Sequence, residues 1–577
     1  MKKRWRFYPK NPEARKALTE ALHVSPVLAQ LLINRGLTDP DSAAGFLKPN
    51  IDNLHDPFLF SHMERAAVRV KDAILKHEKI LVYGDYDVDG ITATALLIHF
   101  FRLVGAEAAH YIPSRIKEGY SLHRGAIEEL GEKNIDLIIS VDCGITNAAE
   151  VDFANSLGID TIVTDHHEPG DTLPNALAIL DAKLPGSTYP YRSLAGVGVA
   201  FKLAWAIAQT FSSEKKLSQE FYQFIMQAMG LAALGTIADV VPLTGENRII
   251  AHHGLKALRE SRNPGVRALL ESAGLGNSPI TASDVGYRLG PRINAAGRMG
   301  KAHLAIELLI TNDTRRAAEL AKMLETENRR RQEVEKAILA SARQKLEERG
   351  GVGDHSTIVL ADEGWHPGVI GIVASKLSEE YHRPTILIAI EDGVGKGSAR
   401  SIPQVILHEA LANCSEHLVT FGGHALAAGL EVNATELPAF TEALEREVAK
   451  MILKKGAEPE LLLDHENPLS SLSRSLISDL EVLGPHGEGN SPPLFCVNDV
   501  EVVGRPRRVG RSGNHLAFTV RQGDVAFKAI AFGQGDTVDA VDRSRKSISL
   551  AFRPIVNYWQ GQESIELDVK DIRCEIQ

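Results

Sequence analysis

The chain has 577 residues, of which 44% are hydrophobic and 24% charged, with a formal net charge of −10 and four cysteines. A chain of this length exceeds what one hydrophobic core usually serves, so we expect about three or four globular domains. No stretch reaches the roughly 20 apolar residues of a membrane span, and no apolar signal sequence follows the basic N-terminus. The cysteines form no Cys-x-x-Cys pair, so we expect a cytoplasmic protein without a membrane partner.

The negative net charge at first argues against a nucleic-acid partner, because contact with phosphate backbones requires a positive surface. The net charge of the whole chain is a poor guide, because bound cations offset the charge of the carboxylates that hold them. What matters for binding is the charge of the local surface. Positive charge gathers in one expected loop between strand-like runs near the C-terminus: Arg505, Arg507, Arg508 and Arg511. Nucleic acid therefore remains a candidate ligand.

The first 50 residues predict a small helical lead-in. Ser25-Pro26 and Asp39-Pro40 are helix-start signals, because a capping side chain followed by proline favours a helix N-terminus. Residues 51–310 predict an α/β domain with a mainly helical second half.

Three apolar, β-branched runs predict buried strands at Lys79–Tyr83, Ile135–Val141 and Asp160–Thr164. The segments between them predict helices, most clearly Gly90–Val104 and Leu122–Lys133. Such βαβ units wind right-handed into a parallel sheet, whose strands all end at one edge. Open α/β sheets bind their ligands at that edge.

Polar clusters follow all three predicted strands: Asp85, Asp87 and Asp89 the first, Asp142 the second, and Asp165, His166 and His167 the third. Carboxylates that converge on one crevice raise one another's pKa, so divalent cations are their natural partners. Oxygen ligands with one or two imidazoles suit Mn²⁺ or Mg²⁺ better than zinc. Two such ions clamp the attacking and leaving oxygens of a phosphoryl transfer, and the pattern therefore predicts a two-metal hydrolase.

Single motifs in this set have other interpretations. An EF-hand loop that starts at Asp85 would need glutamate at its twelfth position, where the chain has Leu96. A Cys143 thiolate could favour zinc, but we interpret this residue as non-ligating. Asp239 ends an apolar, helix-like stretch without a local cationic partner. From that segment alone, a helix-terminal or turn residue is favoured over a metal ligand.

Residues 311–350 predict a long, charged bridging helix without internal glycine or proline. Residues 351–455 predict a second α/β domain with glycine-rich turns at Gly397–Ser401 and Phe421–His424. Glycine lets a backbone approach phosphate closely, and Ser and Arg add donors. Residues 456–490 are expected to form a connector. From 491 to 577, short strands with interleaved aromatic and arginine residues predict an OB-like barrel for single strands.

In order and context, Asp87, Asp89, Asp142, the Asp165-His166-His167 triplet and Asp239 resemble the four motifs of the DHH phosphoesterases. From about residue 50 onward the chain is similar to the bacterial RecJ single-strand-specific exonucleases, notably in Ser193–Phe201, Leu289–Gly300 and Phe421–Gly429. This resemblance implies a DHH-type parallel-sheet metal domain, a long bridging helix, a DHH-associated α/β domain and a C-terminal OB-like β-barrel.

The resemblance also implies roles for single residues. It makes Asp87, Asp89, Asp142, His166 and Asp239 the ligands of two Mn²⁺ or Mg²⁺ ions, with Asp85 as a further member. Asp165 would orient the imidazole of a metal-bound histidine, and His167 would face the scissile phosphate. The implied substrate-binding residues are Arg115, Tyr120, Arg292, Asn294, Arg298, Ser398, Arg400 and His424.

The implied activity is 5′ to 3′ removal of mononucleotides from single-stranded DNA, in DNA repair and recombination. We expect a monomer that works with a helicase and a single-strand-binding protein. Two alternatives stay open: a small-substrate DHH phosphodiesterase for oligoribonucleotides or cyclic dinucleotides, and a catalytically silent replication scaffold. The arginine-rich terminal region argues against the first, and the complete set of expected ligands argues against the second.

Overall fold

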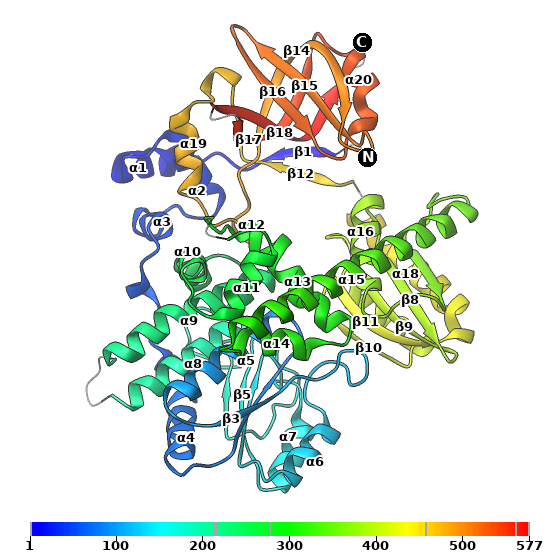
Figure 1. Ribbon diagram of the computed structural model, residues 1–577. Helices are drawn as coiled ribbons and strands as arrows, with labels where there is room; N and C mark the ends of the chain where they lie inside the picture. Colours follow the sequence, from blue (N-terminus) through cyan, green and yellow to red (C-terminus); the bar gives the residue numbers. More distant parts are fainter. Residues whose placement is uncertain (1–2, 213–216, 277, 456–457, 560–561, 575–577) are drawn as a thin grey trace. The chain divides into compact units, whose positions relative to one another are not determined.

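The computed structural model describes residues 3–212, 217–276, 278–455, 458–559 and 562–574. The chain folds into two compact units (Figure 1). The larger unit comprises residues 55–241 and 253–457, and the smaller unit comprises residues 1–54, 242–252 and 458–577. The expected lead-in and connector are therefore not separate domains, because both fold together with the C-terminal region.

The larger unit begins with a parallel five-stranded sheet in the order β3-β2-β4-β5-β6. Its strands are β2 (Ile80–Gly84), β3 (Ala108–Tyr111), β4 (Leu137–Val141), β5 (Asp160–Thr164) and β6 (Ala178–Leu180). The three predicted strands are confirmed, while β3 and β6 are additional. The register pairs Gly84 with Val141, Val141 with Thr164, and Thr164 with Leu180, so four neighbouring strands end level at one edge.

Both predicted helices between the first two strands are confirmed, as α5 (Val88–Leu103) and α6 (Arg124–Glu132). Helix α5 begins at Val88 because the Asp87 carboxylate accepts hydrogen bonds from the backbone N–H groups of Asp89 and Gly90. The remaining helical elements of this part are α4 (Met63–Leu75), α7 (Ala148–Ser156), α8 (Gly196–Thr210), α9 (Gln219–Ala238), α11 (Pro264–Ser272), α12 (Ala282–Asp284), η3 (Val285–Leu289), α13 (Gly290–Arg298) and α14 (Ala302–Ile310). Helix α10 (Gly245–Arg259) has residues in both units.

Helix α9 has the length and apolar composition of a membrane span, although no such run was expected from the sequence. Of its most apolar 18-residue window, 56% is buried inside the protein. Its buried residues pack against α5 and α8. These contacts are those of a core helix, which explains the apolar composition without a membrane.

The predicted bridging helix is confirmed as α15 (Thr314–Glu348), capped by the Asp313 carboxylate. Its first half buries Leu320 and Leu324, and its second half contributes Ile338 and Leu346 to the next core. That core belongs to a second sheet, in the order β10-β11-β9-β8-β7. Its elements are β7 (Ile358–Asp362), α16 (Ile370–Tyr381), β8 (Thr385–Glu391), β9 (Val394–Arg400), α17 (Leu407–Ala412), β10 (Thr420–Gly423), β11 (Ala427–Asn433) and α18 (Leu437–Lys455).

The expected glycine-rich turn at Gly397–Ser401 is wrong, because residues 397–400 lie inside β9. The reason is packing: a Cβ on Gly397 would lie 2.6 Å from a methyl carbon of Leu430. Glycine here makes room for a large neighbour on the adjacent strand. Likewise, Phe421 to Gly423 lie in β10.

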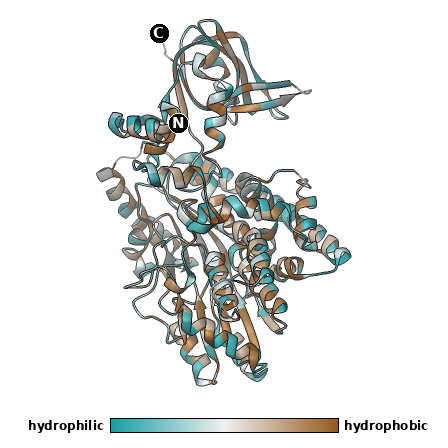
Figure 2. Cartoon of the chain, turned by 90° about the vertical axis from the view of Figure 1, so that its left-hand side faces the viewer, coloured by the Kyte–Doolittle hydropathy of each residue, from teal (hydrophilic) through white to brown (hydrophobic). Residues whose placement is uncertain are grey.

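The smaller unit contains the predicted OB-like barrel. Strands β14 (Phe495–Val509), β15 (His515–Gln522), β16 (Val525–Ala531), β18 (Gln562–Cys574) and β17 (Ile548–Trp559) pair in this order, and β17 pairs back with β14. This pairing closes a five-stranded barrel. Its strands and helices mix hydrophobic and hydrophilic residues, as amphipathic elements do (Figure 2).

The N-terminal helices share the core of the barrel. Leu18 and Leu28 belong to the same buried cluster as Leu476, Phe495 and Phe552. The elements involved are β1 (Arg4–Phe7), α1 (Pro12–Leu22), α2 (Pro26–Asn34), α3 (Pro40–Leu47), β12 (Glu460–Leu463), β13 (His465–Glu466), α19 (Arg474–Glu481) and α20 (Val538–Arg543). Both predicted helix starts are confirmed, because the side chains of Ser25 and Asp39 cap α2 and α3.

Candidate metal centre

The level ends of the first sheet bring the acidic clusters together. Asp85 follows β2, Asp142 follows β4, and the Asp165-His166-His167 triplet follows β5. Asp85 and Asp142 are each 2% exposed, so their carboxylates lie inside the protein rather than in solvent. Burial of several carboxylates at one edge needs compensation by positive charge or by protons.

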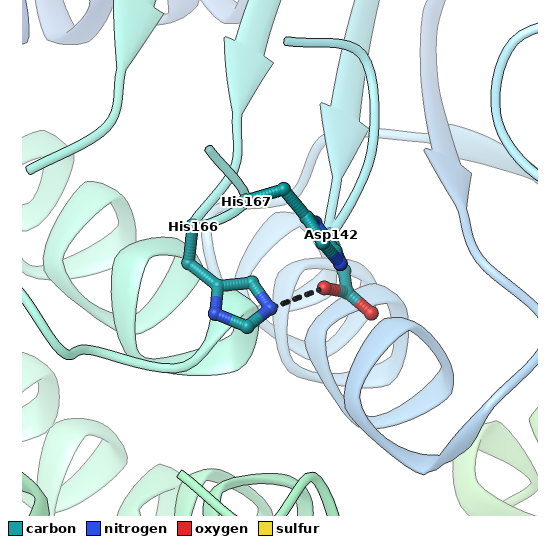
Figure 3. Close-up of side chains that lie close together, drawn as sticks. All are labelled: Asp142, His166 and His167. Atoms are coloured by element: carbon teal, nitrogen blue, oxygen red, sulfur yellow. Dashed lines mark ion pairs between the residues drawn. The ribbon is translucent and has the colours of Figure 1, made fainter. Parts of the chain in front are cut away.

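His166 lies at the middle of this cluster. Its Nε2 atom is 3.1 Å from Oδ1 of Asp142, 3.5 Å from Oδ2 of Asp239 and 3.8 Å from Oδ2 of Asp89. Figure 3 shows the imidazole turned toward the Asp142 carboxylate. Asp239, at the C-terminal end of α9, thus joins the strand-end cluster through the fold.

The candidate ligands form three overlapping groups, each with ligand atoms within 4.8 Å of one another. One group is Asp89, His166 and Asp239, and a second is Asp85, Asp87 and Asp142. The third group, Asp142, His166 and His167, overlaps both, so Asp142 and its contact with His166 lie between the first two groups. This arrangement suits two cations that share one carboxylate.

The ligand atoms themselves fit metal ions. Among the described residues, Oδ1 of Asp85, Oδ1 of Asp142 and Nε2 of His166 are buried side-chain atoms without a hydrogen-bond partner. Buried polar atoms are rarely left unpaired, since each would cost about 1–3 kcal/mol. Carboxylate and imidazole donors that lie together match Mn²⁺ or Mg²⁺, and the nearby Cys143 thiol is directed at the carbonyl of Tyr83 instead.

Asp142 has a special backbone conformation, with φ of 61° in the left-handed region. Non-glycine residues adopt this region rarely, and such strain is common at functional sites. Gly196 at the start of α8 makes room for the side chain, because a Cβ there would lie 2.7 Å from Oδ1 of Asp142. The same helix start holds Asp89, whose carboxylate accepts the N–H groups of Gly196 and Val197 at 2.7 and 2.8 Å.

Without cations, burial and mutual repulsion disfavour the charged form of Asp85, Asp89, Asp142 and Asp239. Burial, followed by the charge of Asp89, raises the pKa of Asp142 well above its usual range. Burial and the neighbouring carboxylates also raise the pKa values of Asp85 and Asp239, and that of Asp89 to about 7. Burial, aided by His167, lowers the pKa of His166 to about 3, which leaves its imidazole neutral and able to bind metal.

We expect Mn²⁺ to stabilise the protein more at pH 8 than at pH 6. Carboxyl groups with a raised folded-state pKa stabilise the fold below their unfolded pKa of about 3.9, and this contribution is lost as pH rises through the folded value, about 7 for Asp89. Bound cations remove the repulsion that remains. Thermal unfolding with excess EDTA or Mn²⁺ at both pH values measures the effect. An increase in Tm on adding Mn²⁺ that is equal at the two pH values, or larger at pH 6, would contradict this expectation. Because each comparison is made at one pH, the effect of pH on the unfolded state is the same with Mn²⁺ and with EDTA.

His167 is held by Asp165. Its Nδ1 donates to Oδ1 of Asp165 at 2.7 Å, and Asp165 also accepts the N–H groups of Ile145 and His166. Burial alone would lower the pKa of His167, but the hydrogen bond and charge of Asp165 outweigh it and raise that pKa. The expected role of Asp165 is thus corrected: the imidazole that it orients is His167, not that of the candidate ligand His166.

Tyr120 lies beside His167 and Asp142. Its hydroxyl donates to the backbone carbonyl of Asp142 at 3.1 Å and lies 3.1 Å from Nδ1 of His167. The side chain is 42% exposed, and its ring centroid lies 5.5 Å from that of His167.

Three arginines form a cationic cluster in the larger unit. The guanidinium of Arg115 lies 5.0 Å from the ring centroid of Tyr86, in the metal-binding loop. Burial, followed by the charges of Arg115 and Arg400, lowers the pKa of Arg298 to about 9. The pKa of Arg400 is lowered by burial and by Arg115. Like charges brought together inside a protein favour a bound anion, and arginine suits phosphate.

Ser398 belongs to this cluster, because its hydroxyl accepts a hydrogen bond from Nη1 of Arg400 at 3.3 Å. Both side chains are on β9, whereas Arg298 ends α13 and donates to the carbonyl of Gly368. The cluster therefore joins β9 of the second sheet, the end of α13 and the loop after β3.

The other predicted substrate-binding residues are placed differently. Arg292 forms an ion pair with Glu325 at 2.9 Å and donates to the carbonyl of Arg288, so its guanidinium holds α13 against α15. Its role in binding the terminal phosphate stays a prediction. Asn294 is half-buried on α13, and His424 is exposed just after β10.

Asp181 is a candidate that the sequence did not reveal. It follows β6, is 1% exposed, and its Oδ2 has no hydrogen-bond partner among the described residues. Burial raises its pKa to about 7, and Asp165 adds to the shift. The only sequence signal is the three-residue run Ala178–Leu180 before it, which is too short to indicate a strand.

Comparisons with known proteins place the same segments in described families. Residues 79–236 match the DHH family N-terminal domain, residues 354–450 the DHHA1 domain, and residues 463–571 the RecJ OB domain. The single-stranded-DNA-specific exonuclease RecJ of Bacillus subtilis is 37% identical over 99% of this chain and 71% of its own length.

Solved structures agree. The crystal structure of RecJ from Thermus thermophilus with Mn²⁺ is 34% identical, covers 99% of this chain and 79% of that chain, and superposes with a TM-score of 0.84. The corresponding structure with Mg²⁺ is 32% identical, covers 99% and 78%, and has a TM-score of 0.78.

Proposed function

The chain belongs to the RecJ family of single-stranded-DNA-specific exonucleases, and from this premise we propose that it is a metal-dependent exonuclease that hydrolyses single-stranded DNA from the 5′ end to mononucleotides. The observation that carries the proposal is the pair of acidic groups around Asp142 and His166, joined by the contact between these two residues. Among the described residues, buried atoms of Asp85, Asp142 and His166 lack a hydrogen-bond partner. Bound Mn²⁺ or Mg²⁺ would supply an activated water and stabilise the charge that develops on the phosphate.

The side chains around the ions divide the remaining work. The two acidic groups would hold the ions, while His167, fixed by Asp165, lies beside Asp142 and His166. An imidazole with a raised pKa can donate a proton or a hydrogen bond to the phosphate that is cleaved. Tyr120 beside it offers a ring for the terminal base.

The cluster of Arg115, Arg298 and Arg400 supports two parts of the proposal: degradation that starts at the 5′ end, and release of one nucleotide in each step. Arginines are suited to a terminal phosphate, which carries more charge than an internal phosphodiester. When the 5′-phosphate of a strand is held at this cluster, one internucleotide bond of that strand lies at a fixed distance from the cluster. That bond would lie at the residues that would hold the ions, among them Asp85, whose pKa Arg115 influences, so one nucleotide would be released at a time.

The test is digestion of a single-stranded oligonucleotide labelled at either end, with and without a 5′-phosphate, in Mn²⁺ or EDTA. The proposal predicts mononucleotides from the 5′ label at once, a 3′ label that stays on progressively shorter strands, and no reaction in EDTA. Cleavage from the 3′ end, or equal cleavage of duplex DNA, would contradict it.

Neither alternative activity is favoured. A small-substrate phosphodiesterase has no need of a barrel with exposed arginines, which this chain has on β14. A silent scaffold has no need of a complete ligand set, which is intact around Asp142.

We also propose that the protein works in the cytoplasm as a monomer, with a helicase that supplies single strands and a single-strand-binding protein that keeps them open. The proposed enzyme acts only on an unpaired 5′ end, which supports a role for partners that unwind DNA and keep it single-stranded.

The barrel is proposed to bind the strand electrostatically. Its arginines were expected in a loop, but Arg505, Arg507 and Arg508 lie on the long strand β14 and only Arg511 lies in the turn after it; all four are exposed. Exposed arginines on a β-barrel suit the backbone of a single strand.

Replacing Arg505 and Arg507 by alanine is expected to weaken binding of a long single strand and to flatten its salt dependence. Each lost phosphate contact should reduce the slope of log K against log salt by about 0.7, so the pair should reduce it by about 1.4. Fluorescence anisotropy over a salt series in EDTA measures the slope. Arg521→Ala is the matched control, because Arg521 is already paired with Glu501 at 2.9 Å. Equal slopes for the double variant and wild type would rule out this surface.

A further inference from the structure

Tyr287 is an aromatic side chain that the proposed mechanism does not use. It is 83% exposed and lies in η3, the single π-helical turn between α12 and α13. A lone exposed apolar residue needs no explanation in itself. Tyr287 differs from other exposed apolar residues in two respects: the turn that carries it is rigid, and this turn adjoins the metal centre.

The turn is fixed on both sides of Tyr287. Val285 and Leu289 are fully buried. Asp284 accepts hydrogen bonds from the N–H and hydroxyl of Thr281 and pairs with Arg288 at 3.0 Å. Tyr287 therefore projects from a backbone that is already ordered, so binding through its ring would cost little conformational entropy. Single π-helical turns are also frequent at functional sites.

The turn adjoins the metal centre. A Cβ on Gly290 would lie 3.4 Å from Cβ of Ala238 and 4.0 Å from Cγ2 of Val88. Ala238 precedes Asp239, and Val88 lies between Asp87 and Asp89. Gly290, three residues after Tyr287, thus packs directly on two segments that carry metal-ligand candidates.

Helix α13, which follows the turn, also packs on the loop from Asp85 to Asp87. A Cβ on Gly297 of α13 would lie 2.5 Å from the carbonyl oxygen of Tyr86, between Asp85 and Asp87. From Gly290 to Gly297, α13 therefore forms a wall of the metal centre, and Tyr287 stands at the end where this wall begins.

A second exposed apolar residue follows the end of α9, a helix that packs against η3. Val240 follows Asp239, is 64% exposed, and has φ of 61°. A β-branched residue in the left-handed region is an outlier that usually marks a functional constraint. Near Ala238 and Gly290, the chain thus presents an exposed aliphatic and an exposed aromatic side chain on two packed elements.

We propose that Tyr287 is a DNA-binding residue whose ring stacks on a base of the strand at the metal centre, with Val240 as its apolar neighbour. The inference rests on the proposed function and extends it. Stacking on the face of a base is independent of sequence, as an exonuclease that degrades any strand requires. The arginine cluster holds a phosphate, whereas Tyr287 holds a base.

The first test compares Tyr287→Ala, Tyr287→Phe and Tyr222→Ala. Tyr222 is the matched control: it is 54% exposed on α9 but lies 17 residues before Asp239, about 25 Å away along the helix. For a long single strand we expect Tyr287→Ala to raise KM about tenfold, within the range of one lost base-stacking contact, with kcat within about twofold. Tyr287→Phe keeps the ring and should match wild type, as should Tyr222→Ala.

The second test identifies the base. In EDTA, anisotropy measures binding of strands with one abasic site moved stepwise from the 5′ end. Wild type should lose affinity at one position, and there Tyr287→Ala should show no further loss, because ring and base form one contact. Tyr287→Leu serves as a second variant if the alanine protein fails to fold.

An unchanged KM and affinity in Tyr287→Ala, an equal loss in Tyr222→Ala, or the same abasic penalty with and without the ring would overturn the inference. Because binding is measured without hydrolysis, the two proposals can fail separately. A wild-type protein that binds through Tyr287 but does not cleave single strands would contradict the proposed function alone.

Discussion

Asp142→Asn is expected to abolish hydrolysis while the protein stays folded. Asp142 is the carboxylate between the two ligand groups, and its Oδ1 is buried without a hydrogen-bond partner. Loss of this shared ligand removes several kcal/mol of charge stabilisation, so the rate should fall by about 10³-fold or more. Asparagine is the right replacement, because it tolerates the left-handed backbone that Asp142 adopts.

Turnover of an end-labelled single strand at saturating Mn²⁺ measures this effect. Asp152→Asn, an exposed position on α7, controls for the loss of a carboxylate from the same domain and should behave as wild type. Activity of the Asp142 variant within about tenfold of wild type, a barrier change of only ~1.4 kcal/mol, would refute the shared-ligand role.

His167→Ala and His166→Ala are expected to fail for different reasons. His166 Nε2 points at three carboxylates, so its loss should weaken Mn²⁺ binding. His167 gives its Nδ1 to Asp165, so its loss should leave metal affinity nearly intact but lower kcat by about 10²- to 10⁴-fold, as for a positioned proton donor. Figure 3 shows both imidazoles beside Asp142. Because the two histidines are similarly close to Asp142, a difference between the two variants reports a difference in their roles.

Calorimetric titration with Mn²⁺ in parallel with turnover separates the two roles. Equal weakening of Mn²⁺ binding in both variants would show that His167 is a ligand as well. Unchanged binding in His166→Ala would remove His166 from the ligand set.

The sequence was sufficient to predict the edge of the sheet where the metal centre lies. Long β-branched runs such as Ile135–Val141 indicate buried strands whatever surrounds them, and parallel connections fix where they end. Asp181 was missed because β6 has only three residues. Asp239 could be recognised only through resemblance, since nothing in its own segment shows that the end of α9 meets His166.

Long-range packing accounts for the remaining differences between sequence and structure. The N-terminal helices join the barrel through side chains such as Leu18 that touch residues more than 400 positions away, and no local pattern carries that information. The ion pair of Arg292 with Glu325 depends on how α13 packs against α15. Gly397 was interpreted as a turn because local propensity cannot reveal that Leu430 fills the space beside it.

The most direct test of the two-metal centre is the anomalous diffraction of crystals grown with Mn²⁺. The account predicts two manganese peaks, one among Asp89, His166 and Asp239 and one among Asp85 and Asp87, with the Asp142 carboxylate in contact with both. A single peak, or two peaks of which only one contacts Asp142, would contradict it.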